Sequence, residues 1–235
     1  MKVSFLLPTN RDHEIFASHI VKNINETCHL EKEILVYSPD EIEGENVKWY
    51  KEEPPFEGCI EGYNFLYKQS KGDYIVTSND ESGFWEGVVA AAINLLESEY
   101  YEKKKLKIIG LGSNKGTFPN SDVSDGYSCI PTFGLKTPQG YRICGYPVFQ
   151  RDTVEDYLDG HIFHPEFKHH YADNYLPFYA GLLGEPLNDC PASCCVLVTK
   201  NESAVSRTDT NDHDVKVYER LIRELDAGTR KSYVN

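Results

Sequence analysis

Acidic and amide side chains follow a short apolar run within the first half of the chain. Asn79, Asp80 and Glu81 come directly after the residues 74–77, Tyr-Ile-Val-Thr, which have the composition of a buried strand. Open α/β sheets bind ligands at the carboxyl ends of their strands. Carboxylate and amide oxygens suit Mg²⁺ or Mn²⁺, and such an ion neutralises a diphosphate. The segment is therefore a candidate site for a metal ion and a diphosphate, with an ordinary polar turn as the alternative.

Composition and charge narrow the classes of partner. The 235 residues include 24 Lys and Arg against 37 Asp and Glu, a formal net charge of −13, which disfavours nucleic acid and anionic membrane surfaces. The sequence contains no apolar stretch of transmembrane length and no signal-peptide pattern before its first strand-like run. The seven cysteines are therefore expected to be free thiols in a reducing, cytoplasmic setting.

Hydrophobic periodicity predicts alternating strands and helices, which is typical of an α/β domain with a mostly parallel sheet. Strands are expected at 3–7, 33–37, 47–50, 74–77, 107–110, 146–149 and 195–198. Helices are expected around 15–24, 59–67, 85–96, 152–158, 173–183 and 215–225. Gly, Ser, Asn, Pro and Thr dominate from 111 to 139, which indicates a long loop. We find no repeat or linker, so a single domain over 1–235 is the simplest account.

Two helix ends carry specific expectations. Gly72 is expected to end the helix that begins near Cys59, because glycine is common just after a helix. Pro177 fits only in the first turn of its helix, which places Asp173 and Asn174 at the N-terminal end of that helix. Asp173 could then be simply an N-cap that satisfies backbone N–H groups.

Missing motifs exclude several enzyme classes. The turn after the first strand, Pro8-Thr9-Asn10-Arg11-Asp12, has no glycine, and the chain has no Walker A motif. A dinucleotide-binding dehydrogenase is therefore disfavoured. A nucleotidyltransferase is disfavoured as well, because a glycine-rich turn is expected there. The sequence also lacks the Gly-x-Ser-x-Gly elbow of α/β-hydrolases.

Three segments in order resemble the GT-A glycosyltransferases, most closely the family-2 group of inverting nucleotide-sugar transferases. The first is the opening strand and Pro-Thr-x-x-Arg turn over 3–11, and the second spans 58–81, with Asn64 at its centre and the acidic motif at its end. The third spans 145–173, with Gly-Tyr-Pro-x-Phe-x-Arg, then Phe-x-Pro-x-Phe, and then Asp173. The resemblance implies a GT-A fold, with nucleotide-sugar binding over about 1–110 and the acceptor side over about 111–235.

The chain departs from the family pattern at two positions. Asn79 stands where the first Asp of the metal motif is usual, and Glu81 occupies its last position. Of the acidic pair before the acceptor helix, only Asp173 is present, because Ala172 replaces the other acid. The metal ligand is thus left open between Asp80 and Glu81, and a metal-independent enzyme remains an alternative.

The resemblance implies roles for particular side chains. Asp173 is the expected catalytic base, which takes a proton from an acceptor hydroxyl as that oxygen attacks the anomeric carbon. Asp80 or Glu81 is expected to hold Mn²⁺ or Mg²⁺ on the diphosphate, and His213 is a weaker candidate for a late metal ligand. The residues expected to bind the nucleotide sugar are Pro8, Thr9, Arg11, Asp40, Asn64, Asn79 and Asp80.

The resulting hypothesis is a glycosyltransferase that moves a sugar from a nucleoside diphosphate sugar to an acceptor hydroxyl, inverting the anomeric centre in one displacement. The acceptor is a glycan, a lipid-linked molecule or a small molecule. A catalytically silent relative that only binds a nucleotide sugar is the alternative from another class, and a nucleotidyltransferase is the third. The histidines at 161, 164, 169 and 170 do not share one face, so a dedicated metal site is not expected there.

Overall fold

The computed structural model describes residues 1–9, 14–53, 58–79, 82–113, 127–128, 140, 146–196, 198–199 and 207–234. Three of the expected site residues, Arg11, Asp80 and Glu81, lie outside these ranges. Most of the expected loop at 111–139 lies outside them as well, although the strand before it continues to Ser113.

The centre of the described structure is an eight-stranded sheet with the order β3-β2-β1-β4-β8-β6-β9-β5. The strands are β1 (Lys2–Pro8), β2 (Glu31–Ser38), β3 (Val47–Lys51), β4 (Tyr74–Thr77), β5 (Ser82–Phe84), β6 (Ile108–Ser113), β8 (Pro147–Gln150) and β9 (Asn188–Val196). A separate antiparallel pair joins β7 (Tyr127–Ser128) to β10 (Val198–Thr199). The strand expected at 195–198 covers the end of β9 and the first residue of β10, whereas the short strands β5 and β7 were not expected from periodicity.

The first four strands of that order are parallel, as the sequence predicts. The prediction of the strand near 146–149 is also confirmed, but β8 runs antiparallel to both of its neighbours, β4 and β6. Because of this reversal, the beginning of β8 meets the carboxyl end of β4. Tyr146, which directly precedes β8, is thereby brought to the edge of the sheet where Asn79 emerges.

Alternating side chains along the parallel strands pack into two separate cores. Phe5 and Leu7 of β1 point into one core, whereas Leu6 between them points into the other. Ile34 and Val36 of β2 likewise face away from Leu35. These side chains are fully buried. Both faces of the sheet are therefore covered, which explains why the strands read as continuous apolar runs rather than alternating ones.

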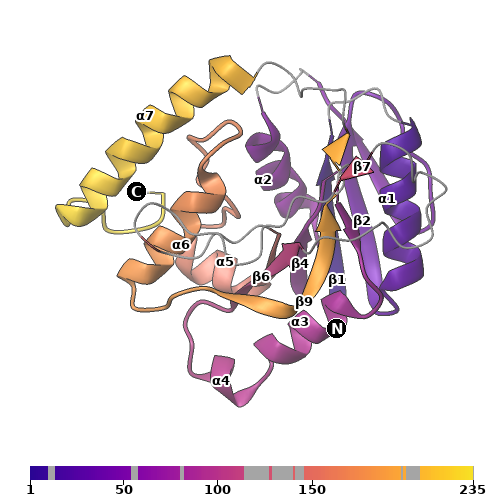
Figure 1. The fold of residues 1–235 in the computed structure, drawn as a ribbon, viewed down its shortest axis with the longest axis horizontal. Coiled ribbons are helices and arrows are strands. Elements are labelled where there is room, and N and C mark those ends of the chain that lie inside the picture. The colour runs from indigo at the N-terminus through magenta and orange to yellow at the C-terminus, as the bar shows by residue number, and fades with distance from the viewer. Residues whose placement is uncertain are drawn as a thin grey trace.

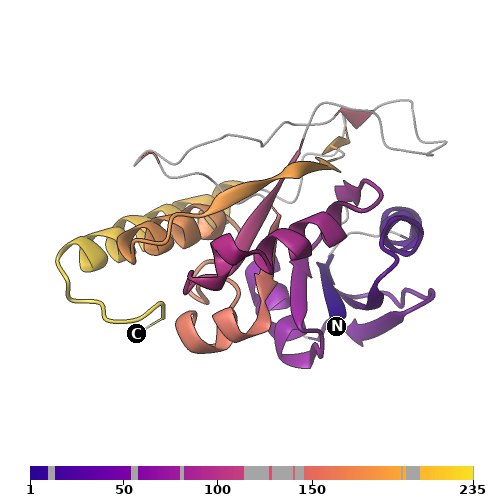
Figure 2. The same cartoon turned by 90° about the horizontal axis from the view of Figure 1, so that it is seen from below.

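Helices cover both faces. They are α1 (Glu14–Thr27), α2 (Cys59–Gln69), α3 (Val88–Leu96), α4 (Glu99–Glu102), α5 (Arg151–Tyr157), α6 (Ala172–Leu182) and α7 (Arg207–Asp226). The core under α1 and α3 takes the Phe5 side of the sheet, and α2, α5, α6 and α7 contribute to the other core. Figure 1 shows α1 and α7 at opposite sides of the molecule, and Figure 2 shows α6 and α7 running side by side.

The predicted end of the second helix is wrong. Helix α2 ends at Gln69 and is followed by the extended residue Ser70, so Gly72 is not its terminator. Gly72 instead packs against β1, where an added Cβ would lie 2.6 Å from the backbone nitrogen of Ser4. Close approach of two backbones, not helix termination, is the reason for glycine at this position.

The third helix and the proline helix also begin at residues other than the expected ones. Trp85 lies before α3 rather than in it, and its side chain is exposed. Pro177 is the sixth residue of α6, beyond the first turn. A proline has no N–H, so it cannot donate to the carbonyl of Asp173 four residues earlier. Asp173 still lies in the first turn, as predicted.

The fold is thus an α/β fold with a mixed, mostly parallel sheet and flanking helices, in one domain. Among the described residues, none of the helices combines the length and the apolar character needed to cross a membrane.

Candidate active site

A pocket of about 130 Å³ lies at the carboxyl end of β4, between the strand ends and the N-terminal ends of α2 and α6. Its lining comes from segments far apart in the sequence. The lining residues are Cys59, Ile60, Tyr63, Thr77, Asn79, Tyr146, Phe163, His169, Ala172 and Asp173. The pocket therefore joins two residues that the sequence singled out for different halves of the reaction, Asn79 and Asp173.

The strand side of the pocket is held by tyrosines. The amide nitrogen of Asn79 lies 3.5 Å from the hydroxyl of Tyr146, across the junction of β4 and β8. The hydroxyl of Tyr63 in α2 donates to the carbonyl of Ser78 at 2.8 Å. The position of the chain just after β4 is thereby fixed from two neighbouring elements, which orients the Asn79 side chain toward the pocket lining.

The helix side of the pocket presents Asp173 in the first turn of α6. The N-cap of this helix is Tyr171, whose backbone is left-handed with φ 62°, and no side chain caps the helix. Asp173 is the second helical residue, so the alternative interpretation of Asp173 as the N-cap is wrong. Burial raises the pKa of the Asp173 carboxyl, although its own N–H, that of Asn174 and the charge of His170 act in the opposite direction. A base with a raised pKa is better matched to proton transfer near neutral pH.

Asn64 connects α2 to the segment that leads toward α6. Its amide nitrogen donates to the carbonyl of Phe163 at 2.8 Å, and its oxygen accepts from the N–H groups of Ile162 and Phe163 at 3.0 and 3.2 Å. The side chain is 6% exposed. Asn64 therefore has a structural role, because it holds the backbone of Phe163, whose side chain lines the pocket. The predicted contact of Asn64 with a nucleotide sugar stays a prediction.

A cysteine and a histidine meet at the rim of the pocket. The sulfur of Cys59, the first residue of α2, lies 3.3 Å from Nδ1 of His169. Among the described cysteines, Cys28, Cys59 and Cys190 are free thiols. Cys28 and Cys190 are buried, whereas Cys59 is half-buried.

Other predicted nucleotide-side residues lie along the same sheet edge. Pro8 ends β1, and the buried Thr9 donates its N–H to the carbonyl of Tyr37 in β2 at 2.9 Å. Asp40 is exposed, two residues beyond the end of β2. Because β2, β1 and β4 are adjacent and parallel, these residues and Asn79 share one edge of the sheet. Their contacts with a nucleotide stay predictions.

Of the predicted metal ligands, only His213 lies among the described residues. Asp80 and Glu81 lie outside the described residues, and so does the predicted phosphate contact Arg11. His213 is exposed on α7, and its Nε2 lies 3.0 Å from the carbonyl oxygen of Glu166. Across the described ranges, no group of three or more His, Cys, Asp and Glu side chains is arranged to hold a metal ion. The assignment of a metal to Asp80 and Glu81 stays a prediction.

Of the histidines between β8 and α6, His164 is a buried core side chain. His164 is fully buried against the rings of Phe167 and Tyr175. Burial lowers the pKa of His164 to about 4, with the nearby charge of Arg230 acting in the same direction. His164 is therefore neutral at physiological pH and serves as a core side chain.

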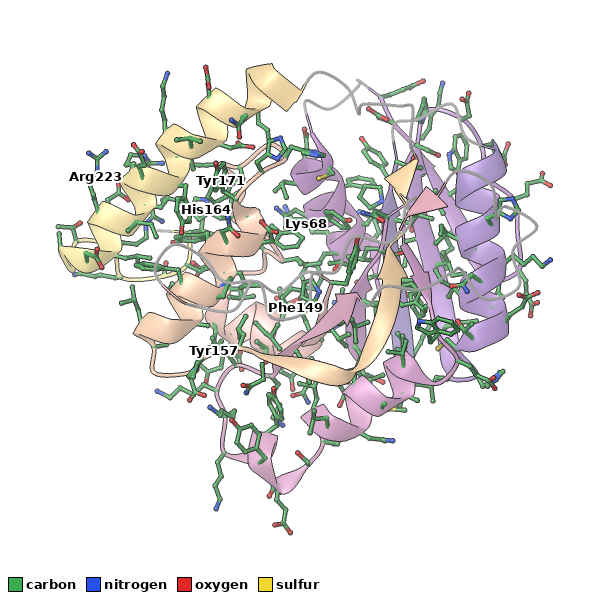
Figure 3. The ribbon with its side chains drawn as sticks, in the orientation of Figure 1. Lys68, Phe149, Tyr157, His164, Tyr171 and Arg223 are labelled. Carbon is green, nitrogen blue, oxygen red and sulfur yellow. The ribbon has the colours of Figure 1, made fainter. Side chains whose placement is uncertain are left out.

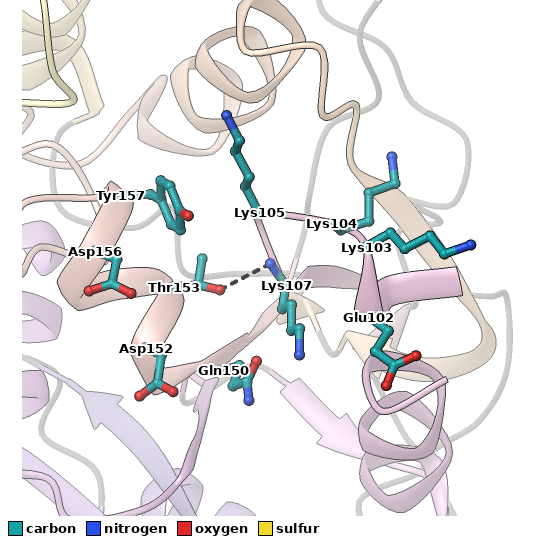
Figure 4. A pocket seen from close by; sticks show the side chains of 10 residues that line it. All are labelled: Glu102, Lys103, Lys104, Lys105, Lys107, Gln150, Asp152, Thr153, Asp156 and Tyr157. Carbon is teal, nitrogen blue, oxygen red and sulfur yellow. Dashed lines mark hydrogen bonds between the residues drawn. The ribbon is translucent and has the colours of Figure 1, made fainter. Parts of the chain in front are cut away.

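A second cavity, of about 260 Å³, lies between α4, β6 and α5. Its lining includes Lys103, Lys104, Lys105 and Lys107 together with the carboxylates of Glu102, Asp152 and Asp156. Figure 4 shows that the lysine side chains point in different directions and do not converge on one point. Lys104 is already paired with Glu185 at 3.4 Å. This arrangement does not form a site for a single anion.

Sequence reasoning missed several residues that build the pocket. Tyr146 belongs to the Gly-Tyr-Pro-x-Phe-x-Arg segment, but the antiparallel direction of β8, which brings it to the pocket, is invisible in the sequence. Asp214 follows His213, the weaker metal candidate, and the sequence assigns it no role of its own. Asp214 is nevertheless fully buried, and its carboxylate accepts hydrogen bonds from backbone N–H groups beside the pocket. A charged residue within the apolar stripe of a helix was the available signal.

Comparison with solved structures identifies the fold. S. aureus TarS 1–349 in complex with UDP-GlcNAc aligns with a TM-score of 0.61 and 14% identity, over 94% of this chain and 66% of that one. The mannosyltransferase PcManGT from Pyrobaculum calidifontis, in complex with GDP-Man and Mn²⁺, aligns with a TM-score of 0.59 and 14% identity, over 99% of this chain and 65% of that one. The chain thus spans about two thirds of these longer proteins.

At this level of identity the similarity establishes the fold, which is the GT-A-like glycosyltransferase fold. No protein-family model matches the sequence, and no curated protein matches it. The fold predicted from the three sequence segments is therefore confirmed by structure.

Proposed function

We propose that this protein is a glycosyltransferase that moves a sugar from a nucleoside diphosphate sugar to an acceptor hydroxyl, with inversion of the anomeric centre. The observation that carries the proposal is the pocket shared by Asn79 and Asp173 at the carboxyl end of β4. Ligands bind at this edge in open α/β sheets. The solved structures with the same fold that were obtained with UDP-GlcNAc and with GDP-Man support a nucleotide-sugar donor.

The size of the pocket decides which part of the substrates it holds. Its volume of about 130 Å³ is well below the roughly 300–1,000 Å³ that is typical of sites for whole small molecules. The pocket therefore receives the reacting groups, while the nucleotide extends along the sheet edge past Thr9 and Asp40. Tyr63, Tyr146 and Phe163 supply aromatic surface for a sugar face in this pocket.

In this proposal Asp173 is the catalytic base. Its carboxylate removes the proton of the acceptor hydroxyl while that oxygen forms a bond to the anomeric carbon. The bond between this carbon and the diphosphate oxygen breaks at the same time, and the diphosphate leaves with the electron pair. A single displacement inverts the configuration and needs no covalent intermediate.

A divalent ion is a further part of the proposal. When bound, Mn²⁺ or Mg²⁺ neutralises charge on the diphosphate leaving group. Asp80 and Glu81 are the residues expected to hold it, since they follow β4 and Asn79 directly. The roles of Asp173 and Asn79 do not depend on which ion is bound.

The proposal is tested with the full chain and a panel of nucleotide sugars, with and without Mn²⁺. We expect binding of at least one donor and slow release of its nucleoside diphosphate. Asp173→Asn should lower the rate of transfer or hydrolysis about 10²–10⁴-fold with donor affinity unchanged, because only the proton acceptor is lost. Asp156→Asn, an exposed acid on α5, is the matched control and should behave as wild type.

Three outcomes contradict parts of the proposal. Absence of binding to every nucleotide overturns it entirely. Binding without turnover, under every acceptor and metal condition, favours the silent nucleotide-sugar-binding relative. Wild-type activity in Asp173→Asn removes this residue from the role of base and leaves the class of reaction standing.

A further inference from the structure

We propose that Asp214 of the C-terminal helix α7 is a positioning residue for the pocket. It holds the turn at 168–170, and through this turn it sets the places of His169 and Asp173. The inferred effect on catalysis rests on the proposed glycosyltransferase activity, whereas the geometric part of the inference does not.

The carboxylate of Asp214 accepts hydrogen bonds from three successive backbone N–H groups. Oδ1 accepts from Lys168 at 2.9 Å, and Oδ2 accepts from His169 at 2.9 Å and from His170 at 2.7 Å. Asp214 is fully buried. Hydrogen bonds to a charged acceptor are about twice as strong as neutral ones, so this carboxylate fixes the backbone of the whole turn.

The same turn is held from the opposite side by the beginning of α2. The carbonyl of Lys168 accepts from the N–H of Ile60 at 3.2 Å. A Cβ added at Gly58 would lie 1.9 Å from that carbonyl oxygen, so only glycine allows the two backbones to approach this closely. Contacts from both α2 and α7 therefore fix the backbone of the turn.

Helix α7 makes further contacts with the approach to the turn. Nε2 of His213 lies 3.0 Å from the carbonyl oxygen of Glu166, and Arg220 forms an ion pair with the Glu166 carboxylate. His213 and Asp214 thus both hold residues of the segment 166–170, whereas Asp212 is exposed. This use differs from the metal-binding role that the sequence suggested for His213.

Tyr171, which directly follows the turn, connects it to the start of α6. Tyr171 adopts φ 62°, a left-handed conformation that is uncommon for a large side chain. Its ring packs against Tyr218 of α7, with ring centroids 5.4 Å apart. Figure 3 shows Tyr171 beside α7. Helix α6 begins at the next residue, so the contacts with α7 determine where Asp173 points.

Asparagine is not a neutral replacement at position 214. Its single side-chain oxygen can accept the bonds to one side, but its NH₂ group would face a backbone N–H donor on the other. Alanine removes all three bonds. Asp212 provides a matched control, because it is an exposed acid two residues away on the same helix.

The inference has a readout that does not require enzymatic activity. Cys59 contacts His169, so displacement of the turn should separate the sulfur from Nδ1. A neutral imidazole that accepts the thiol proton promotes formation of the reactive thiolate. We expect Asp214→Ala to slow the labelling of Cys59 by iodoacetamide, measured on its peptide by mass spectrometry. The thiol of Cys28, 4% exposed, should stay protected, which reports that the fold is intact.

The kinetic expectation is a fall in kcat with little change in the KM for the donor. A displacement of about 1 Å at the base is expected to lower kcat about 10²-fold. Asp214→Asn should give a smaller loss in both readouts, and Asp212→Asn should give none. A variant that had lost the fold as a whole would instead label at both cysteines and lose donor binding.

The outcomes separate the two proposals. Wild-type kcat and wild-type Cys59 labelling in Asp214→Ala overturn the positioning role. If the wild-type protein turns over no donor, the proposed function fails, and the rate of Cys59 labelling still decides the positioning role. If Cys28 becomes labelled in Asp214→Ala, the milder Asp214→Asn carries the test, and wild-type labelling of Cys59 in that variant overturns the inference.

Discussion

On the strand side of the pocket, Asn79 stands two residues beyond the end of β4, and its place follows mainly from the pairing of β4 with β1, to which the contacts of Tyr63 and Tyr146 add. On the helix side, Asp173 stands after an irregular segment, and its place follows from side chains that bind backbone groups. Asn64 holds the segment at Phe163, and Asp214 holds it at 168–170. Asn79 is thus positioned mainly by the regular hydrogen bonds of a β-sheet, whereas Asp173 is positioned by a few individual side-chain contacts.

This difference predicts how substitutions on the two sides affect stability and activity. A sheet ladder distributes the placement of Asn79 over many backbone hydrogen bonds, so changes among its supports should lower stability while leaving the geometry of the pocket intact. The helix side depends on single buried polar side chains, and a lost partner leaves buried backbone groups unsatisfied. Changes on the helix side should therefore affect both stability and activity.

The largest effect on stability is expected for Asn64→Ala. The change leaves the N–H groups of Ile162 and Phe163 and the carbonyl of Phe163 without their partner. At about 1–3 kcal/mol for each unsatisfied group, with partial relief by water, we expect a loss of about 3–5 kcal/mol. Urea unfolding measures it, and Gln69→Ala, exposed on the same helix, is the control. A loss below about 1 kcal/mol would show that water replaces the amide.

The next effect concerns Glu33, which is buried on the strand side. Burial acts to raise its pKa, but hydrogen bonds from Lys48, Ser4, the Lys71 N–H and Lys2 outweigh burial and lower the pKa to about 2. Relative to the ordinary value of 4.5, this corresponds to about 3 kcal/mol of stability. We expect Glu33→Gln to lower the free energy of unfolding by this order at neutral pH, with activity unchanged.

The stabilisation by Glu33 should depend on pH. Because the folded pKa is lowered, the stabilisation is complete above about pH 4.5, declines between about 4.5 and 2, and disappears below that. The difference between wild type and Glu33→Gln should close over the same interval. Glu31→Gln, an exposed residue of the same strand, should show no such difference. A difference that is constant with pH would contradict the assignment.

Gly72 on the strand side of the pocket and Gly58 on the helix side allow the same substitution to be compared on both sides. Gly72→Ala would place a Cβ 2.6 Å from the Ser4 nitrogen, and Gly58→Ala would place one 1.9 Å from the Lys168 oxygen. Each should lower stability by about 1–3 kcal/mol through overpacking. Only Gly58→Ala should also lower kcat, because it moves the turn that carries His169. Equal activity loss in both variants would remove the distinction between the two sides.

The smallest expected effect is a slight gain in stability for Asp173→Asn. Burial raises the pKa of Asp173, so the fold favours its protonated form and disfavours the carboxylate. Stability should therefore fall as the pH rises from about 3.8, the ordinary value, through the raised pKa, and stay lower above it. Asp173→Asn should melt slightly higher than wild type at neutral pH while losing activity. Equal melting temperatures at acidic pH are the control, and a lower melting temperature at neutral pH contradicts the prediction.

Most elements of the first half could be predicted, because local signals there agree with one another; the three-residue strand β5 is an exception. The apolar runs at β1, β2 and β4 are continuous and bounded by turn residues, and the helices between them show clear periodicity. The second half gave weaker signals. The direction of β8 and the position of Pro177 within α6 depend on neighbours that are distant in the sequence, so the local pattern did not contain them.

The sequence by itself determined the strand that delivers Asn79, the helix start that carries Asp173, and the GT-A-like character of the chain. These features depend on short-range patterns of apolar residues, turn residues and side-chain types. Only the tertiary structure decided that Asn79 and Asp173 share a pocket with Tyr146 and His169, and that Asp214 holds the turn between them. Such placements arise from antiparallel pairing and from single polar contacts between distant segments, for which a sequence carries no periodic signal.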